Sequence, residues 1–225
     1  MIAVFGLGWF AEEPEPHLPT LASDILRCTH AGGHFAIAVE TVDTAPAISG
    51  ESLKRHDTAV RALAAQAESF LPARFGQTFA DRAALLEAVV ARAPAFAEAL
   101  TLVRGCSQMT LRWFGEAEIA PEPTALSAGE GPGARYLARR RAELAAENTL
   151  PEVAAEQQRL QPFVRGERVR RGGGNGLLGT VYHLVADSDL ARYRAELAEL
   201  EAAATLRLRA SGPWPNYAFA PELAG

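Results

Sequence analysis

The histidines are the side chains here with the clearest capacity for chemistry, because a neutral imidazole can act as a base or bind a metal. His56 stands next to Asp57 on the apolar stripe of an expected helix, where a catalytic or ligand role can be imagined. We favour a buried histidine that is hydrogen-bonded to the backbone. His30 and His34 flank a Gly32-Gly33 turn, but no carboxylate or cysteine stands at a spacing that would complete a metal site. Two exposed turn residues is therefore the preferred interpretation.

Two further sequence features, a glycine-rich segment and two arginine clusters, could be taken for anion-binding sites. The glycine-rich segment Gly172 to Gly176 joins two strand-like runs, whereas phosphate loops lead from a strand into a helix, so a hairpin turn is expected. Basic clusters lie on one expected helix and on the hairpin after it: Arg135, Arg139, Arg140 and Arg141, then Arg165, Arg168, Arg170 and Arg171. Because Glu143, Glu147 and Glu167 are interspersed with these arginines, we favour a solvated face or a protein-docking surface over nucleic acid.

The sequence contains no nucleophile elbow, no HExxH motif and no paired histidine and carboxylate motif. It therefore predicts no catalytic residue, no cofactor and no metal site. One alternative stays open: a small-molecule enzyme that holds an anion with Arg74, Arg112 and His56. A second is an RNA-binding module that stacks bases on strand aromatics of an open sheet face, namely Trp113, Phe114, Phe163 and Tyr182.

The bulk properties narrow the class of protein. The 225 residues are 48% hydrophobic and 22% charged, which predicts a soluble globular protein with room for two domains. A net charge of -5 argues against nucleic acid as a partner. Two distant cysteines fit a reducing cytoplasm, the N-terminal residues lack the features of a signal peptide, and no apolar run approaches the roughly 18 residues of a membrane span.

The elements that must position these residues begin with a small α+β arrangement. We expect a strand over Met1 to Gly8 and a hairpin of Ile25 to His30 and His34 to Val42. A helix from Gly50 carries one apolar stripe, composed of Leu53, His56, Val60, Leu63, Ala67 and Phe70. Ser69 to Phe79 reads as a bent strand. Asp81 is expected to cap a helix over Ala83 to Val103, which Pro94 should kink or divide into two pieces.

The second half predicts the order β, α, β, β, α, β, which is typical of ferredoxin-like domains. Its first elements are a strand over Cys106 to Phe114, with Met109, Leu111 and Trp113 on one side and Thr110, Arg112 and Phe114 on the other, and a helix from Gly133 to about Gln161. A hairpin of Phe163 to Arg171 and Leu177 to Val185 follows. The last elements are a helix capped by Asp187 or Ser188, with Leu190, Tyr193, Leu197 and Leu200 inward, and a strand over Thr205 to Arg209. The fold class is thus α+β in two domains: an N-terminal α+β domain over 1–104, a ferredoxin-like domain over 105–211 and a proline-rich tail over 212–225.

Several of these segments, in order, resemble the GvpL/GvpF family of gas vesicle proteins. Leu71-Pro72-Ala73-Arg74-Phe75-Gly76 is similar to the family's Leu-Pro-x-Arg-Phe-Gly segment. The family's helix end and following strand resemble Val103-Arg104-Gly105 and the strand Gln108 to Trp113. The family's next helix starts with Gly-x-Gly-x-x-Tyr-Leu, which is similar to Gly131-Pro132-Gly133 with Tyr136-Leu137. Gly212-Pro213-Trp214-Pro215-Asn216-Tyr217-Ala218-Phe219 is close to its ending, with Asn216 in place of a second proline.

The resemblance implies two α+β domains, no catalytic site and no cofactor. It also implies a cytoplasmic, gas vesicle associated accessory protein whose partners are the main gas vesicle shell protein and other accessory proteins, with neither nucleic acid nor membrane as a partner. A strongly apolar shell subunit needs a partner that covers its surface before assembly. The candidate partner-contact or domain-junction residues are Arg74, Phe75, Gly76, Trp214, Pro215, Tyr217 and Phe219.

We prefer a second interpretation of these residues, in which the segments around Arg74 and Trp214 both pack internally. Arg74 then ties the domains together, and Trp214 covers the second sheet. An Arg74→Ala substitution separates the two, because a residue that only contacts a partner can be lost without melting the protein.

Overall fold

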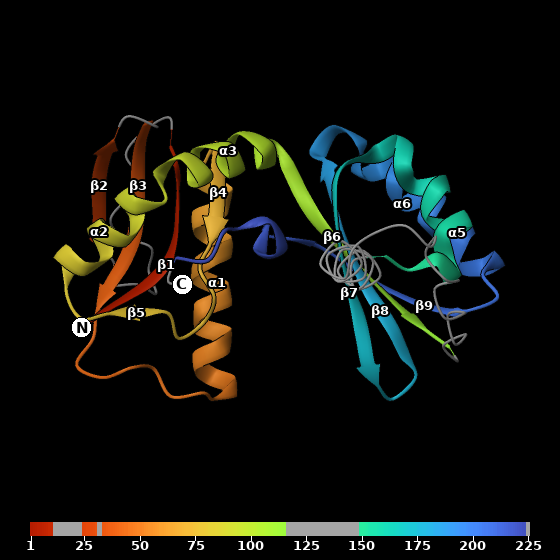
Figure 1. Ribbon diagram of the computed structural model, residues 1–225, viewed down its shortest axis with the longest axis horizontal. Coiled ribbons are helices and arrows are strands. Elements are labelled where there is room, and N and C mark those ends of the chain that lie inside the picture. The colour runs from red at the N-terminus through yellow and green to blue at the C-terminus, as the bar shows by residue number, and fades with distance from the viewer. Residues whose placement is uncertain (11–23, 31–32, 116–148, 224–225) are drawn as a thin grey trace, which may run out of the picture. The chain divides into compact units, whose positions relative to one another are not determined.

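A computed structural model describes residues 1–10, 24–30, 33–115 and 149–223 of the chain. Its internal contacts form two compact units (Figure 1): a first unit of Met1–Gln108 with Pro213–Gly225, and a second unit of Met109–Gly212. Each unit contains one antiparallel sheet with helices, which confirms a mixed α and β chain. The expected domain limits, 1–104, 105–211 and 212–225, remain a prediction.

The first unit is built on a sheet whose central strand is almost entirely apolar. In β1 (Ile2–Trp9) every residue up to Gly8 is buried. This strand pairs antiparallel with β3 (Gly33–Thr41), β4 (Ser69–Pro72) and the short β5 (Thr78–Phe79). β2 (Asp24–His30) pairs with β3, so the order is β2-β3-β1-β4 and the predicted hairpin is confirmed.

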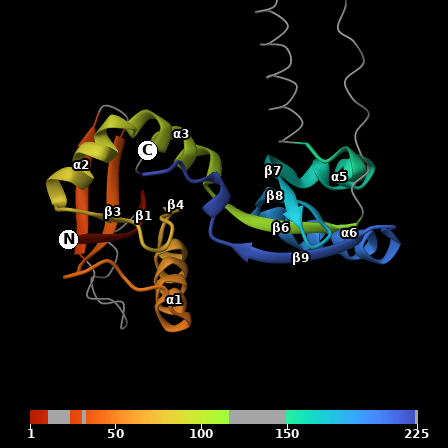
Figure 2. The same ribbon diagram turned by 60° about the horizontal axis from the view of Figure 1, so that its bottom comes forward.

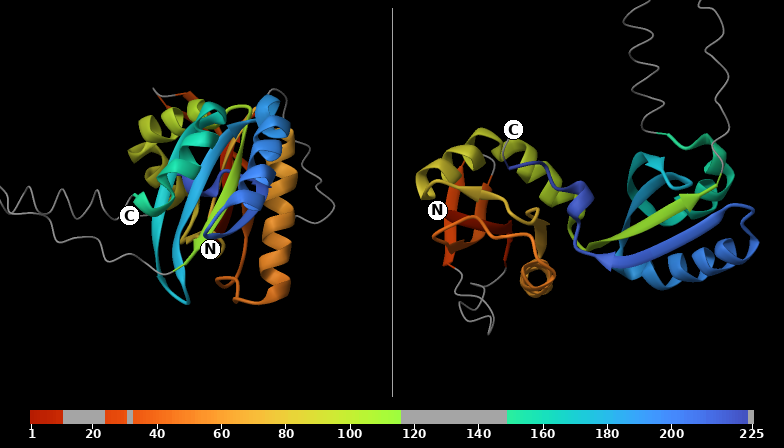
Figure 3. Two further views of the ribbon diagram at one scale, coloured as in Figure 1. Left: turned by 90° about the vertical axis from the view of Figure 1, so that its right-hand side faces the viewer. Right: turned by 90° about the horizontal axis from the view of Figure 1, so that it is seen from below.

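Helices cover both faces of this sheet. α1 (Gly50–Gln66) brings Val60 and Leu63 against Phe5 and Phe70 on one face. α2 (Arg82–Ala91) and α3 (Ala93–Val103) cross the other face (Figure 2), where the Ser69 hydroxyl donates to the Leu100 carbonyl at 2.5 Å. The right-hand view of Figure 3 looks along α1 and shows it across the sheet from α3.

The helix boundaries follow from local sequence. Ser49 and Ser52 form a capping box in which the Ser49 hydroxyl accepts from the Ser52 amide at 3.1 Å. The Asp81 carboxylate accepts from the Ala84 amide at 2.9 Å, which confirms the predicted cap. Pro94 lies in the first turn of α3, and the expected helix is divided there into α2 and α3, which is one of the two predicted outcomes.

The second unit carries four strands in the order β7-β8-β6-β9. β6 (Cys106–Phe114) and β9 (Arg207–Trp214) neighbour each other, and β7 (Val164–Gly174) and β8 (Leu177–Ala186) form an antiparallel hairpin. Asn175 and Gly176 turn the chain with φ of 52° and 70°. The glycine-rich segment is therefore a hairpin turn, as predicted.

One face of this second sheet is covered by helices (Figure 3, left). They are the single-turn helices η1 (Pro151–Val153), η2 (Gln161–Phe163) and η3 (Asp187–Asp189) and the α-helices α5 (Ala154–Leu160) and α6 (Leu190–Ala203). The core between sheet and helices includes Leu111, Trp113, Leu160, Val181 and Tyr193, none of which exposes surface. The predicted inward stripe of α6 and the inward side of β6 are thus confirmed.

Three local expectations are wrong. Leu53 is 44% exposed, because the buried face of α1 starts one turn later at His56, and the stripe residues Ala67 and Phe70 lie outside the helix, which ends at Gln66. The helix from Gly133 to Gln161 is not continuous: residues 133–148 lie outside the described residues, and Pro151, which lacks an amide hydrogen, opens a new single-turn helix. Neither Asp187 nor Ser188 caps α6, since both belong to η3 and the capping position, Asp189, makes no side-chain capping bond.

Candidate partner-contact site

The segment after β4 forms a tight loop on the surface of the first unit. The Ala73 amide donates to the Phe5 carbonyl at 2.8 Å, so the chain is still held to β1 there. It then turns, with the Gln77 amide donating to the Arg74 carbonyl at 3.2 Å. Gly76 has a φ of 81°, a conformation that side chains rarely adopt, which explains a glycine at this point. The turn leaves Arg74 exposed and Phe75 half-buried.

The C-terminal segment after β9 is fixed to the first unit by two hydrogen bonds. The Asn216 side-chain Nδ2 donates to the Cys106 carbonyl at 3.1 Å, and the Gln108 side-chain oxygen accepts from the Ala218 backbone amide at 2.7 Å. The single-turn helix η4 (Tyr217–Phe219) then contacts β4, with Phe219 only 2% exposed. The segment is thus part of the packed first unit.

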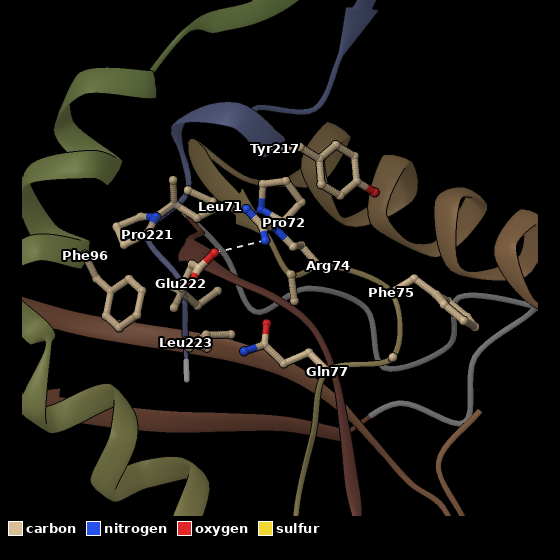
Figure 4. A pocket seen from close by; sticks show the side chains of 14 residues that line it. Leu71, Pro72, Arg74, Phe75, Gln77, Phe96, Tyr217, Pro221, Glu222 and Leu223 are labelled. Atoms are coloured by element: carbon tan, nitrogen blue, oxygen red, sulfur yellow. Dashed lines mark ion pairs between the residues drawn. The ribbon is translucent and has the colours of Figure 1, made fainter. Parts of the chain in front are cut away.

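The two segments meet at a cavity of about 290 Å³. Figure 4 shows Arg74 and Glu222 facing each other across it. Its walls come from the loop, the C-terminal segment, β1 and α3, and the residues that line it are Leu7, Leu71, Pro72, Ala73, Arg74, Phe75, Gly76, Gln77, Phe96, Tyr217, Ala220, Pro221, Glu222 and Leu223. Sequence reasoning singled out both segments but did not predict that they would share a site.

One ion pair bridges the two segments. Arg74 Nη1 lies 2.9 Å from Glu222 Oε1, with 72% and 59% of the two side chains exposed. An exposed pair of this kind contributes only about 0–1 kcal/mol to folding. Arg92 of the α2–α3 junction donates to the Glu222 carbonyl, and the neighbouring Leu223 is buried. Buried apolar contacts therefore hold the segment more firmly than the ion pair does.

Trp214 and Tyr217 lie beside α1 of the first unit. The Arg61 guanidinium carbon is 4.6 Å from the centre of the Trp214 ring, and Arg61 also bonds Asp57 at 2.7 Å. The pKa of Tyr217 is raised to about 12, mainly by burial and also by the nearby charge of Asp57, while the Arg61 charge opposes the change. Tyr217 is therefore a neutral, apolar-sided wall of the cavity at physiological pH.

His56 supports the loop from beneath. Its Nε2 is 3.1 Å from the Ala73 carbonyl, its ring stacks on Phe5 at 5.3 Å, and Phe75 contacts its edge at 5.6 Å. Burial lowers the pKa of His56, against the opposite effects of the Ala73 hydrogen bond and of Asp57. The expected buried histidine bonded to the backbone is confirmed.

The residues of the two alternative functions are not brought together. Arg112 lies on β6 of the second unit and lines neither the cavity described above nor a smaller one of about 40 Å³ beside His56. Trp113 is buried in the core and Phe163 packs edge-on against Tyr193. The expectation that these two of the four aromatics would be open for RNA stacking is therefore wrong. Among the described residues, no three potential ligands are grouped to hold a metal.

A buried polar network in the second unit was missed. His183 is fully buried, with Nδ1 2.9 Å from the Tyr193 hydroxyl and Nε2 3.0 Å from a Glu167 carboxylate oxygen. Burial, together with the Glu167 charge, raises the pKa of Tyr193 above its ordinary value. A histidine at an inward position of an apolar strand was the available signal. The network joins β7, β8 and α6.

Comparisons with known proteins identify a matching family and two similar solved structures. The model of a family described as gas vesicle synthesis protein GvpL/GvpF matches residues 13–221. Curated proteins give no match. Among solved structures, the gas vesicle protein GvpF from Anabaena sp. PCC7120 is similar with a TM-score of 0.65 at 14% identity, over 98% of this chain and 95% of that one. GvpF from Microcystis aeruginosa gives 0.69 at 11%, over 98% of each.

Proposed function

This chain belongs to the gas vesicle synthesis protein GvpL/GvpF family, and from that premise we propose that it is a non-catalytic accessory protein that binds the main gas vesicle shell protein and assists shell assembly. In this proposal it works in the cytoplasm, associated with the gas vesicle and with other accessory proteins. No helix in the described part of the chain is long and apolar enough to cross a membrane.

The observation that carries the proposal is the meeting of two segments at one cavity. Leu71–Gly76 and Gly212–Phe219 are the two stretches that carry the most specific resemblance to the family. The first lines the 290 Å³ space, and the second reaches it through Tyr217 and is followed by further lining residues, Ala220 to Leu223. Neither segment surrounds a group of catalytic residues. A shared surface feature built from both is better suited to recognising another protein than to chemistry.

The character of the cavity fits an apolar partner. Leu7, Leu71 and Phe96 supply apolar walls, and Phe75 stands half-buried at its side. The charged groups at the mouth pair with each other, so an entering apolar segment does not have to desolvate an isolated charge. We propose that Arg74, Phe75, Gly76, Trp214, Pro215, Tyr217 and Phe219 form or support this contact.

We also propose that the second unit is a ferredoxin-like domain. The order of its elements along the described chain is β6, α5, β7, β8, α6, β9, and the sheet order β7-β8-β6-β9 supports it. In this arrangement both main helices share one face of the sheet. The fold itself says nothing of the activity.

The test is a binding measurement between the purified full chain and the main gas vesicle shell protein. We expect saturable binding by the unchanged chain, and its absence contradicts the proposal. Three variants then separate contact from internal support: Arg74→Glu, Glu222→Arg, and both together, which restores an ion pair with reversed polarity.

If Arg74 contacts the partner, the double variant regains the stability of the unchanged chain in urea but not its affinity. If Arg74 only holds the C-terminal segment, both properties return. Lys54→Glu is the matched control, because it makes the same charge change at an exposed position of α1 outside the cavity. Loss of binding in that control shows a general charge effect instead of a local contact.

A further inference from the structure

The strands of the second sheet present two chemically different faces. On β6, Leu111 and Trp113 point into the core, so Arg112 and Phe114 point to the opposite face. Val169 of β7 pairs with Val181 of β8, and both join the core. Arg168 and Arg170, one residue to either side of Val169, therefore point away from the helices.

The edge strand β9 extends the same pattern. Leu208 is in the core, so its neighbours Arg207 and Arg209 face away from it. The Arg207 guanidinium carbon lies 4.5 Å from the centre of the Phe114 ring, which places these two side chains on one face. The five arginines that share this face, which we call the arginine face, are all exposed: Arg112, Arg168, Arg170, Arg207 and Arg209.

Acidic residues are absent from the strands on this side. Within the four described strands, Glu167 is the one acidic residue. It pairs in register with His183 and bonds it, and His183 in turn bonds Tyr193 of α6, so Glu167 lies on the helix-covered face. The described strands therefore place no acidic side chain on the arginine face.

We propose that the arginine face binds an acidic helical segment of a partner protein. Its arginines come from β6, β7 and β9, which span the full width of the sheet. Three strand spacings amount to roughly 15 Å. An α-helix of about three turns has that length, and it can place carboxylates one turn apart along a single side.

Two observations favour an acidic protein segment over RNA. The aromatic rings on this face are not free for base stacking, because Arg207 covers Phe114 and Tyr182 is half-buried between the strands. The chain as a whole carries a net charge of -5, which repels a long polyanion but does not prevent a short acidic helix from docking locally.

The proposal is tested with the full chain and a fluorescent synthetic helix that carries glutamates at every third or fourth position of one side. We expect saturable binding that weakens as salt rises, and at least tenfold weaker binding by the double variant Arg112→Glu, Arg170→Glu. The control is Arg192→Glu, Arg194→Glu, which makes the same charge change on α6 and is expected to bind within about twofold of the unchanged chain.

A glutamine version of the peptide and a single-stranded RNA of similar length complete the test. Equal binding of the glutamine peptide, or equal loss in both double variants, overturns the proposal. Tighter binding of the RNA than of the acidic helix overturns it in favour of nucleic acid. Circular dichroism of each variant shows whether it is folded, so that binding is compared only between folded proteins.

Discussion

Among the histidines whose burial the structure describes, each unit of this chain has one that is buried, and the two are held in opposite ways. His56 in the first unit makes one hydrogen bond, to a backbone carbonyl, and otherwise touches aromatic rings. His183 in the second unit uses both ring nitrogens, each with another side chain. The first histidine supports a single loop, whereas the second joins a hairpin to a helix.

The contrast teaches what each unit can tolerate. A histidine with one backbone partner can be replaced at the cost of one hydrogen bond. A histidine inside a network leaves two other polar groups to be satisfied, and the Tyr193 hydroxyl has no access to water. Polar networks of this kind fix one arrangement of the surrounding elements, which suits a domain that must present a defined surface.

The largest expected effect is that of His183→Leu. It removes both hydrogen bonds and leaves the buried Tyr193 hydroxyl unpaired, so we expect a loss of about 3 kcal/mol in the free energy of unfolding. Urea denaturation followed by tryptophan fluorescence measures it. A loss below about 1 kcal/mol contradicts the view that the network holds the second unit together.

His56→Leu is expected to cost less, about 1.5 kcal/mol, because only the Ala73 carbonyl loses its partner while the apolar contacts with Phe5 and Phe75 persist. The same denaturation experiment applies, with binding to the shell protein as a second readout. If His56→Leu proves more damaging than His183→Leu, the comparison is reversed and the loop is the more critical element.

Tyr193→Phe deletes one hydroxyl from the network without changing the ring. We expect a loss of about 1 kcal/mol, since the His183 to Glu167 hydrogen bond remains. Combining it with His183→Leu in a double-mutant cycle measures their coupling. Additive losses would mean that the two side chains act independently, contrary to the network interpretation.

The smallest effect is a dependence of stability on pH that involves His56. Burial lowers its pKa in the folded chain below the ordinary 6.5, so the unfolded chain binds more protons in mildly acidic solution. Stability conferred by the neutral ring is therefore present above pH 6.5 and is lost as the pH falls towards the folded pKa. The stability difference between the unchanged chain and His56→Leu should shrink from pH 7.5 to 5.5, and a constant difference argues against it.

Much of the fold was accessible from residue spacing alone. The apolar run of β1, the alternation in β6 and the cap at Asp81 are local signals, and the structure confirms each. His56 was correctly interpreted as bonded to the backbone. Local patterns suffice to predict these features because each depends on residues that are close together in the sequence.

The rest depends on contacts between distant parts of the chain. The glutamate of the Arg74 ion pair follows the whole second unit in sequence, and no periodicity predicts that it returns to the loop after β4. The Trp214 ring lies against Arg61 of α1, whereas internal packing was expected to place it over the second sheet. His183 could be paired with Glu167 only once the hairpin register was known.

The return of Pro213–Gly225 to the first unit also has a consequence for synthesis on the ribosome. Domains generally fold as their chain emerges, and residues 109–212 are complete before residue 213 is made. The first unit, although it is begun earlier, must wait for Phe219 and Leu223 to close its core. The cavity shared by the two ends of the first unit therefore forms only on a chain translated through to that point.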